Sequence, residues 1–228
     1  MKRTLMAECE RLEIALTQEQ IDMFCAFGEA LLEKNRVMNL TAITEPEKVA
    51  KLHFADCLSL LKVVDCKNKS VIDVGCGAGF PGVPMKLGEP SIRLTLLDSL
   101  QKRVSWLRET MQKLGVEAQC VAARAEEYQA REQFDIATSR AVARLNVLAE
   151  LCLPFVRVGG YFLAMKAAAA DEELAEAKHA LSVLGGTVER IAEYELDGIT
   201  HRVIVIKKVC PTPASYPRRF AKIKQQPL

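Results

Sequence analysis

Residues 73–82 read Asp-Val-Gly-Cys-Gly-Ala-Gly-Phe-Pro-Gly, and they overlap the end of a β-rich run, Val71–Val74. Three glycines at alternate positions let the backbone turn sharply and pass close to a ligand. The dinucleotide fingerprint spaces its glycines as Gly-x-Gly-x-x-Gly and holds a pyrophosphate at a helix N-terminus. Because the spacing here is Gly-x-Gly-x-Gly, NAD fits less well than a cofactor without phosphate.

Further β-rich runs follow along the chain, with helical stretches between most of them. Alternating strands and helices predict an α/β fold, a mostly parallel sheet covered on both faces. The last two runs are separated by a short loop at Asp197-Gly198, so they predict an antiparallel hairpin at the sheet edge. This arrangement resembles the class I, Rossmann-like methyltransferase fold with a seven-stranded sheet. The runs are Ile92–Leu97, Ala118–Ala123, Phe134–Thr138, Tyr161–Met165, Thr187–Tyr194 and His201–Lys207, and the helices are Leu100–Leu114, Leu145–Val156 and Asp171–Leu184.

The pattern divides the chain into three parts. Residues 1–66 are expected to form an N-terminal helical extension, residues 67–209 the methyltransferase domain, and residues 210–228 a basic tail. Apolar residues recur at helical spacing between Ile21 and Leu32. Thr44 is expected to cap a helix that follows Glu45-Pro46-Glu47, with proline in the first turn.

The composition excludes several classes of protein. The 228 residues, 50% of them hydrophobic, suit one compact domain with a small extension. The first ten residues are neither a secretory signal nor an anchor, and no run reaches the roughly 18 apolar residues of a membrane span. The eight cysteines include no Cys-x-x-Cys pair, so neither zinc nor a disulfide framework is expected. We expect a reduced, cytoplasmic protein without a metal.

The charge is distributed unevenly. Six bases and no acid lie between Lys207 and Leu228, which leaves 25 bases against 29 acids in the rest of the chain. A basic tail on a slightly acidic body indicates a polyanionic partner. A solvated tail that only aids solubility is the alternative, and charge alone does not separate the two.

Two acidic residues follow strands in the order that a nucleoside site needs. Asp98 ends the second predicted strand, where a carboxylate accepts hydrogen bonds from ribose hydroxyls. Glu126 follows the third strand, where it could accept from the adenine amino group or simply cap a short helix. Together with the glycine turn at Gly75, Gly77 and Gly79, these acids predict an S-adenosylmethionine site.

The segment after the fourth predicted strand contains no sequence motif of a nucleophile or a general base. The segment Thr138–Arg144 lacks the Asp/Asn-Pro-Pro-Tyr of amino-group methylases, and no Pro-Cys pair suits cytosine C5 chemistry. Guanine N7 carries a lone pair in the ring plane and no proton, so its methylation needs mainly alignment with the sulfonium methyl. The absence therefore favours an N7 acceptor and a positioning mechanism without a catalytic acid or base.

These residues resemble the bacterial small-subunit (16S) ribosomal RNA guanine-N7 methyltransferase family, also called glucose-inhibited division protein B. The resemblance covers nearly the whole length; beside the 73–84 stretch it includes Asn39–Thr44, His53–Asp56, Ser139-Arg140-Ala141 and Tyr216–Arg219. It departs at Leu52, Cys57 and Ala167, where the family pattern has lysine, serine and glycine. It implies methyl transfer from S-adenosyl-L-methionine to N7 of one guanine, and cofactor contacts at Gly75, Phe80, Ala125, Glu126 and Arg140.

The resemblance makes ribosomal RNA or the small ribosomal subunit the expected partner of a monomeric enzyme. Basic side chains at Arg144, Arg218, Arg219 and Lys222 are predicted to bind the RNA backbone, because Tyr216, Phe220 and three prolines suit an extended, base-stacking tail. His53 has either a structural role or a role near the cofactor. Arg140 and His53 are the two side chains that could contribute to the positioning mechanism. The alternatives are a small-molecule methyltransferase and a non-catalytic nucleotide-binding module.

Overall fold

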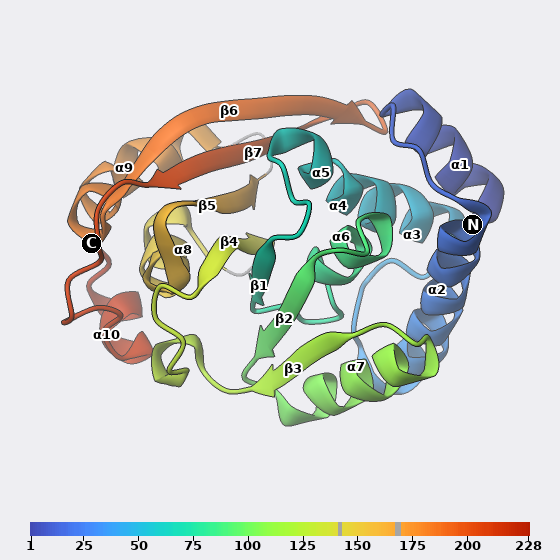
Figure 1. Cartoon of the computed structure of the whole chain (residues 1–228), viewed down its shortest axis with the longest axis horizontal. Coiled ribbons are helices and arrows are strands. Elements are labelled where there is room, and N and C mark those ends of the chain that lie inside the picture. The colour runs from blue at the N-terminus through green and yellow to red at the C-terminus, as the bar shows by residue number, and fades with distance from the viewer. Residues whose placement is uncertain (141–142, 167–169) are drawn as a thin grey trace.

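A seven-stranded sheet in the order β3-β2-β1-β4-β5-β7-β6 forms the centre of the protein (Figure 1). The computed structural model describes residues 1–140, 143–166 and 170–228. β1 to β5 pair in parallel, and β7 runs antiparallel to both β5 and β6. The predicted class I methyltransferase fold is therefore confirmed. The strands are β1 (Ser70–Val74), β2 (Arg93–Asp98), β3 (Ala118–Ala122), β4 (Phe134–Arg140), β5 (Val156–Lys166), β6 (Gly186–Leu196) and β7 (Ile199–Lys208).

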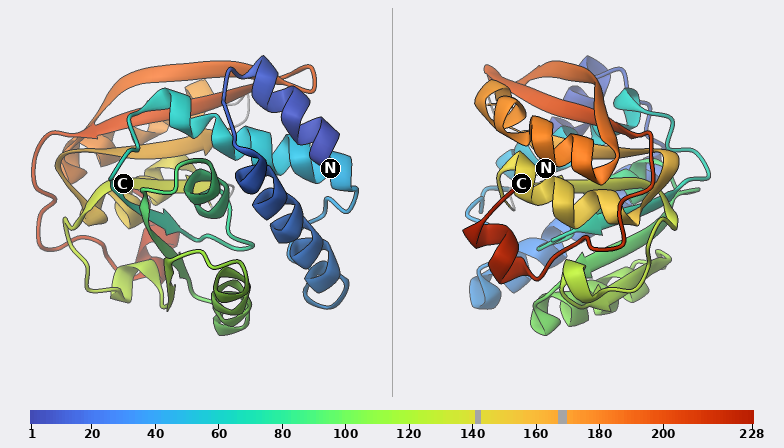
Figure 2. Two further views of the ribbon diagram at one scale, coloured as in Figure 1. Left: turned by 45° about the vertical axis from the view of Figure 1, so that its right-hand side comes forward. Right: turned by 90° about the vertical axis from the view of Figure 1, so that its left-hand side faces the viewer.

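Helices cover both faces of the sheet. α1 and α2 lie along one side of the molecule, away from α8, α9 and α10 (Figures 1 and 2). The helices that pack on one face of the sheet are α1 (Lys2–Arg11), α2 (Gln18–Met38), α3 (Pro46–Val49), the π-helix η1 (Ala50–Ala55), α4 (Asp56–Leu58), α5 (Leu60–Val63), α6 (Gly82–Gly88) and α7 (Gln101–Lys113). The helices that pack on the other face are α8 (Leu145–Cys152), α9 (Ala170–Leu184) and α10 (Phe220–Gln225), with the 3-10 turns η2 (Ala125–Glu127) and η3 (Leu153–Phe155).

Alternation along the strands explains the two layers. Val71 packs with α1 to α7, whereas its neighbour Ile72 packs with α8 and α9 on the other face. β7 repeats the pattern, since Val203 and Val205 face the first layer and Ile204 faces the second. Successive side chains on a strand point to opposite faces, so apolar residues at consecutive positions require helices on both sides. The N-terminal helices therefore share a continuous core with the sheet, and the division at residues 66 and 209 stays a prediction.

Three predictions of local structure were wrong. Glu45, not Thr44, precedes the helix at Pro46, because a proline in the first helical position makes the preceding residue the cap. α8 ends at Cys152 and β5 begins at Val156, since Pro154 cannot continue an α-helix. The tail is not extended throughout. It forms α10 after Pro217, where no proline interrupts residues 218–226.

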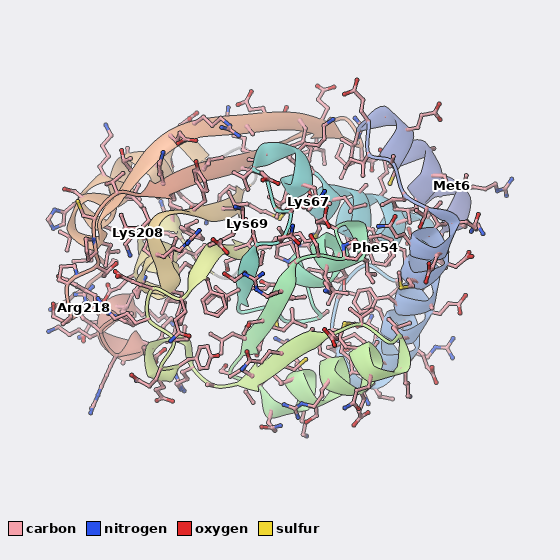
Figure 3. The ribbon with its side chains drawn as sticks, in the orientation of Figure 1. Met6, Phe54, Lys67, Lys69, Lys208 and Arg218 are labelled. Atoms are coloured by element: carbon pink, nitrogen blue, oxygen red, sulfur yellow. The ribbon has the colours of Figure 1, made fainter. Side chains whose placement is uncertain are left out.

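The tail is anchored to the body along its length. Lys208, just before it, is fully buried and donates to Thr212 Oγ1 and to Leu153 O, each at 2.6 Å. Arg131 donates to the carbonyl oxygen of Tyr216 at 2.7 Å. Lys208 and Arg218 lie at the same end of the molecule (Figure 3). The tail is thus a packed element of the fold.

One buried ion pair dominates this anchoring. The Glu150 side chain on α8 is 0% exposed, and the Arg218 side chain is 17% exposed. Arg218 Nη2 lies 2.6 Å from Glu150 Oε2, while the Arg218 backbone N–H and Nε both donate to Oε1. A buried carboxylate needs such compensation, because an isolated charge is costly away from water.

Removal of Arg218 should therefore destabilise the fold strongly. We expect Arg218→Ala to lower the free energy of unfolding by about 3–5 kcal/mol, the cost of leaving one partner of a buried pair uncompensated. Glu150→Leu in the same chain should restore most of the loss. Urea unfolding measures both, with the exposed neighbour Arg219→Ala as the control, expected within about 0.5 kcal/mol of wild type. An Arg218→Ala variant as stable as this control would contradict the account.

Candidate cofactor site

Two adjoining cavities lie at the carboxyl ends of β1, β2 and β3. The loop cavity, of about 380 Å³, is lined by Leu40, Thr41, His53, Gly75, Cys76, Gly77, Ala78, Phe80, Asp98, Ser99, Arg103 and Arg140. The strand-end cavity, of about 150 Å³, is lined by Val74, Gly75, Leu97, Asp98, Ser99, Ala123, Arg124, Ala125, Glu126, Leu151 and Phe220. Gly75, Asp98 and Ser99 line both, so the two cavities share a wall. Because the strand order reverses between β1 and β4, this is the crevice where α/β sheets bind ligands.

The glycines of the turn serve different purposes. Gly75, Gly77 and Gly79 have φ values of 72°, 55° and 94°, a region that favours glycine. Among the described residues, a Cβ on Gly77 would come within 4 Å of Gly75 O alone, at 4.0 Å, and Gly77 lines the loop cavity. A Cβ on Gly79 would lie 2.7 Å from Val83 Cγ2 and 2.9 Å from Leu107 Cδ2. Gly77 thus leaves space for a ligand, whereas Gly79, which lines neither cavity, allows helices to pack on the turn.

Asp73 and Gly82 join the two ends of the glycine stretch. Asp73 is fully buried, and its Oδ2 accepts a hydrogen bond from Gly82 N at 2.8 Å. Any Cβ on Gly82 would lie 2.9 Å from that oxygen. Asp73 Oδ1 has no hydrogen-bond partner within the described parts of the chain, and burial raises the pKa of this carboxyl to about 7. Asp73 therefore holds α6 against the end of β1.

Asp98 has the geometry expected of a ribose acceptor. Its Oδ2 accepts from Gly77 N at 2.9 Å and its Oδ1 accepts from Leu100 N at 2.8 Å. Each carboxylate oxygen can accept two hydrogen bonds, so each retains capacity for a hydroxyl donor. Asp98 is nearly buried where the two cavities meet. The carboxylate is therefore held in place by the protein itself, and its contact with a ribose stays a prediction.

Ala125 and Glu126 lie in η2 and line the strand-end cavity, and their contact with adenine stays a prediction. Glu126 Oε1 accepts from Phe220 N, in the tail, at 3.3 Å. Arg124 Nη1 lies 3.8 Å from the same oxygen. Glu126 is therefore held by contacts from two sides, and its contact with Phe220 connects the strand-end cavity to the C-terminal tail.

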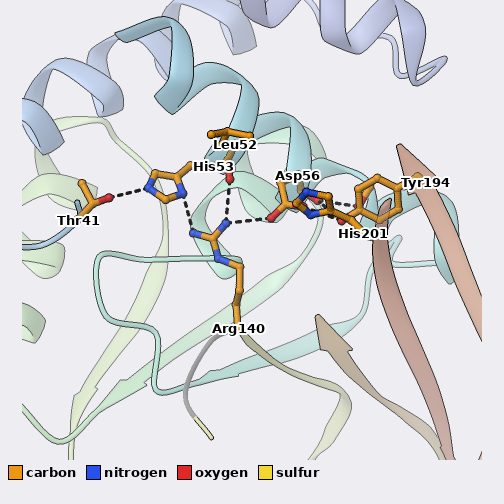
Figure 4. A network of polar contacts seen from close by, with 8 residues as sticks. Thr41, Leu52, His53, Asp56, Arg140, Tyr194 and His201 are labelled. Atoms are coloured by element: carbon orange, nitrogen blue, oxygen red, sulfur yellow. Dashed lines mark hydrogen bonds and ion pairs between the residues drawn. The ribbon is translucent and has the colours of Figure 1, made fainter. Parts of the chain in front are cut away.

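Arg140 lies at the centre of a polar network that joins three parts of the chain (Figure 4). Its Nη1 donates to Asp56 Oδ2 at 3.0 Å and to Leu52 O at 3.2 Å, and its Nη2 lies 2.9 Å from His53 Nδ1. The guanidinium also stacks over the Phe80 ring, 4.9 Å from its centroid. The network places a cation, whose position is fixed by at least three acceptors, in the wall of the loop cavity.

The hairpin completes this network through Asp56. Tyr194 OH donates to Asp56 Oδ1 at 2.7 Å, and His201 Nδ1 lies 2.8 Å from the same oxygen. Burial of Asp56 opposes ionisation, but hydrogen bonds from His201 and Tyr194 and the charge of Arg140 outweigh it, so its pKa is lowered. Asp56 therefore stays ionised and orients Arg140.

His53 is a neutral acceptor in this arrangement. Arginine can only donate, so His53 Nδ1 accepts from Arg140, and Nε2–H donates to Thr41 Oγ1 at 2.8 Å. Burial, reinforced by the Arg140 charge, lowers the pKa of His53 to about 4. The single ring lone pair is already occupied, so His53 positions Arg140 and Thr41. A π-helical turn carries His53, and such turns are frequent at functional sites.

The cavity walls contain no free nucleophile among the described residues. Cys76 is buried, and burial raises its thiol pKa well above the ordinary value, so the thiol stays protonated. The described residues include no cluster of His, Cys, Asp and Glu that could hold a metal ion. Arg103, Thr41 and Phe220 also line the cavities, although sequence reasoning did not select them as cofactor contacts. Arg103 could have been found, because it lies in the first turn of the helix that follows Asp98.

The predicted RNA-binding residues are spread over two elements. Arg144 pairs with Glu176 at 2.7 Å, and Arg218 pairs with Glu150. Arg219 and Lys222 are exposed on the tail beside Phe220. Ala141, Val142 and Ala167 lie outside the described residues. The RNA-binding role of these bases stays a prediction.

The position of Gly77 can be tested with a matched glycine. Gly115 has φ 66°, and no atom of the described residues beyond its chain neighbours lies within 4 Å of an added Cβ. It lies at the opposite end of α7 from the site. We expect Gly77→Ala and Gly115→Ala each to lose about 1–2 kcal/mol of unfolding free energy, the cost of a left-handed backbone for an L-residue. Only Gly77→Ala should weaken the binding of S-adenosylhomocysteine in calorimetry. Equal affinities of the two variants would remove Gly77 from the ligand site.

Known proteins resemble this chain in sequence and in fold. The family model GidB, described as rRNA small subunit methyltransferase G, matches residues 20–202. A protein named ribosomal RNA small subunit methyltransferase G from Alkaliphilus oremlandii is 46% identical over 237 positions, covering 100% of this chain and 99% of its own. The protein of that name from Alkaliphilus metalliredigens is 45% identical and covers 100% and 98%.

A solved structure described as a SAM dependent methyltransferase from Aquifex aeolicus matches the fold, with a TM-score of 0.55. It is 18% identical, and the match covers 74% of this chain and 96% of that one. At this identity the likeness concerns the fold alone. The sequence relatives cover the full length, and the resemblance inferred from the motifs is confirmed. The chain belongs to the rRNA small subunit methyltransferase G family.

Proposed function

We propose that the protein transfers the methyl group of S-adenosyl-L-methionine to N7 of one guanine in small-subunit (16S) ribosomal RNA. Family membership makes it a methyltransferase that uses this donor. The observation that carries the proposal is the pair of adjoining cavities that share Asp98. Gly77 lines one of them, and Glu126 lines the other. That arrangement suits a ligand with an amino-acid end, a ribose and a purine.

Different residues would bind different parts of the cofactor, and these parts would occupy the two cavities. The strand-end cavity, with Ala125 and Glu126, would hold the adenine, and Asp98 would accept from the ribose. The loop cavity, with Gly77 and the cation of Arg140, would hold the charged methionine part. When bound, S-adenosylmethionine supplies a methyl group on a sulfonium, which is an electrophile.

The acceptor side requires little acid–base chemistry from the protein. His53 has its lone pair engaged by Arg140, and the Cys76 thiol is held protonated. Arg140 is itself held by Asp56 and Leu52 O. Arg140, His53 and Cys76 can orient a nucleobase in the loop cavity, but none of these three side chains is free to take up a proton from it. Guanine N7 matches this arrangement, because attack by its in-plane lone pair releases no proton, and alignment then lowers the barrier.

The direct test is a methylation assay on RNA. Protein and methyl-labelled cofactor are incubated with ribosomal RNA or small subunits from a strain that lacks the enzyme. We expect one labelled nucleoside that co-migrates with 7-methylguanosine after nuclease digestion. A label on another nucleoside would correct the acceptor. No transfer to RNA or subunits, with transfer to a small molecule instead, would favour the alternative enzyme class.

The exposed basic side chains of the tail are the proposed contacts to the RNA backbone. Because Glu150 already neutralises Arg218, the sharper variant is Arg219→Ala with Lys222→Ala. Loss of two phosphate contacts should weaken RNA binding and reduce the log–log salt slope by about 1.4 for single-stranded RNA. Lys67→Ala with Lys113→Ala removes the same charge from exposed positions outside the site and is the control. Equal salt slopes for both double variants would rule out contact between the tail and the RNA backbone.

The oligomeric state and the cellular location of the enzyme are also part of the proposal. We propose that it acts as a monomer in the cytoplasm, without a membrane partner. Among the helices that the structure describes, none has the length and apolarity to cross a membrane. The three-part division at residues 66 and 209 belongs to the same proposal.

A further inference from the structure

The tail reaches the cofactor site from the far end of the sequence. Phe220, the first residue of α10, lines the strand-end cavity together with Leu151 and the segment Ala123–Glu126. Its side chain is half-buried and packs against the core of the second layer. Its backbone N–H donates to Glu126 Oε1 at 3.3 Å. One residue therefore contributes both a wall of the cavity and a hydrogen bond to the acid at its end.

We propose that the C-terminal tail is a structural part of the cofactor site, with Phe220 as the aromatic wall of the adenine subsite. The inference rests on the proposed function, since it takes the ligand of this cavity to be the adenosine part of S-adenosylmethionine. It changes the role assigned to the middle of the tail. Phe220, held by the contacts of Arg218 and Ile223, forms one side of the cofactor pocket, while RNA contact is left to the exposed side chains of Arg219 and Lys222.

Anchors on both sides of Phe220 hold it in place. Two residues before it, Arg218 makes the buried ion pair with Glu150 on α8. Three residues after it, Ile223 is 0% exposed and belongs to the second-layer core. At the chain end, Asn146 Nδ2 donates to Leu228 O at 3.4 Å. A side chain held between an ion-paired neighbour and a buried one keeps its position without a ligand, so the wall is formed in advance of binding.

The chemistry of the cavity suits an adenine ring. Phe220 and Leu151 supply apolar surface, and Glu126 supplies an acceptor for an exocyclic amino group. Aromatic side chains stack well on nucleobases, because every base has a π-face. The bond from Phe220 N to Glu126 also holds the carboxylate in one position, so the tail would influence selectivity for adenine.

The test uses two ligands that share the adenosine but differ in the amino-acid part. Calorimetry measures the affinity of full-length variants for S-adenosylhomocysteine and for methylthioadenosine, which lacks the amino-acid end. We expect Phe220→Ala to weaken both ligands by the same factor, about 10- to 100-fold, the range for one lost base–aromatic stack. Phe220→Trp should retain most of the affinity. Gly77→Ala, in the loop cavity, should weaken S-adenosylhomocysteine more than methylthioadenosine.

Lys224→Ala is the matched control, because Lys224 is exposed on the same helix; its affinities should equal wild type. Thermal unfolding checks that each variant folds, and Phe220→Leu, which keeps bulk but removes the ring, replaces Phe220→Ala if the latter is unstable. Wild-type affinity of a folded Phe220→Ala or Phe220→Leu variant for both ligands would overturn the inference, including the case in which only RNA binding falls. Failure of the wild-type protein to bind either ligand would instead overturn the proposed function.

Discussion

The hydrogen bonds between the glycine turn and the end of β2 are the constraint on which the site depends. Gly75 N and Cys76 N both donate to Leu97 O, at 2.8 and 3.1 Å, and Gly77 N donates to Asp98 Oδ2. These bonds fold the loop over the neighbouring strand and fix the carboxylate in the same step. Asp98 lines both cavities, so the hydrogen bond from Gly77 N holds a shared part of their walls in place. A backbone held by its own hydrogen bonds forms a ligand site that is organised in advance.

A second constraint ties the N-terminal extension to the sheet. Asp56 accepts from Arg140 on β4 and from Tyr194 and His201 on the hairpin. Its burial makes the loss of any partner costly, so the extension, the strand end and the hairpin are held in one arrangement. Arg140 then faces the loop cavity with its donors directed by fixed acceptors. The extension is therefore part of the site, since it supplies the acceptors that hold the cation.

The tail closes the opposite side in the same way. Its basic composition favours a polyanionic partner, yet the guanidinium of Arg218 is neutralised by a carboxylate that cannot reach water. Composition counts charges without regard to their partners, and a buried acid 68 residues away in sequence decides what this base does. Arg219 and Lys222 remain exposed. Neighbouring bases in one segment thus serve different purposes, one in the fold and the others at the surface.

The sequence by itself determined the sheet, the order of strand and turn, the family, and the positions of Gly77 and Asp98. These follow from local patterns, in which alternation, glycine spacing and the acid at a strand end act within a few residues of one another. Only the tertiary structure decided the π-helical turn at His53, the three contacts of Asp56, the pairing of Glu150 with Arg218, and the place of Phe220 beside Glu126. Apart from the local π-helical turn, those interactions join residues far apart in the chain. Their energies depend on burial and on atom-to-atom geometry, which exist only once the chain has folded.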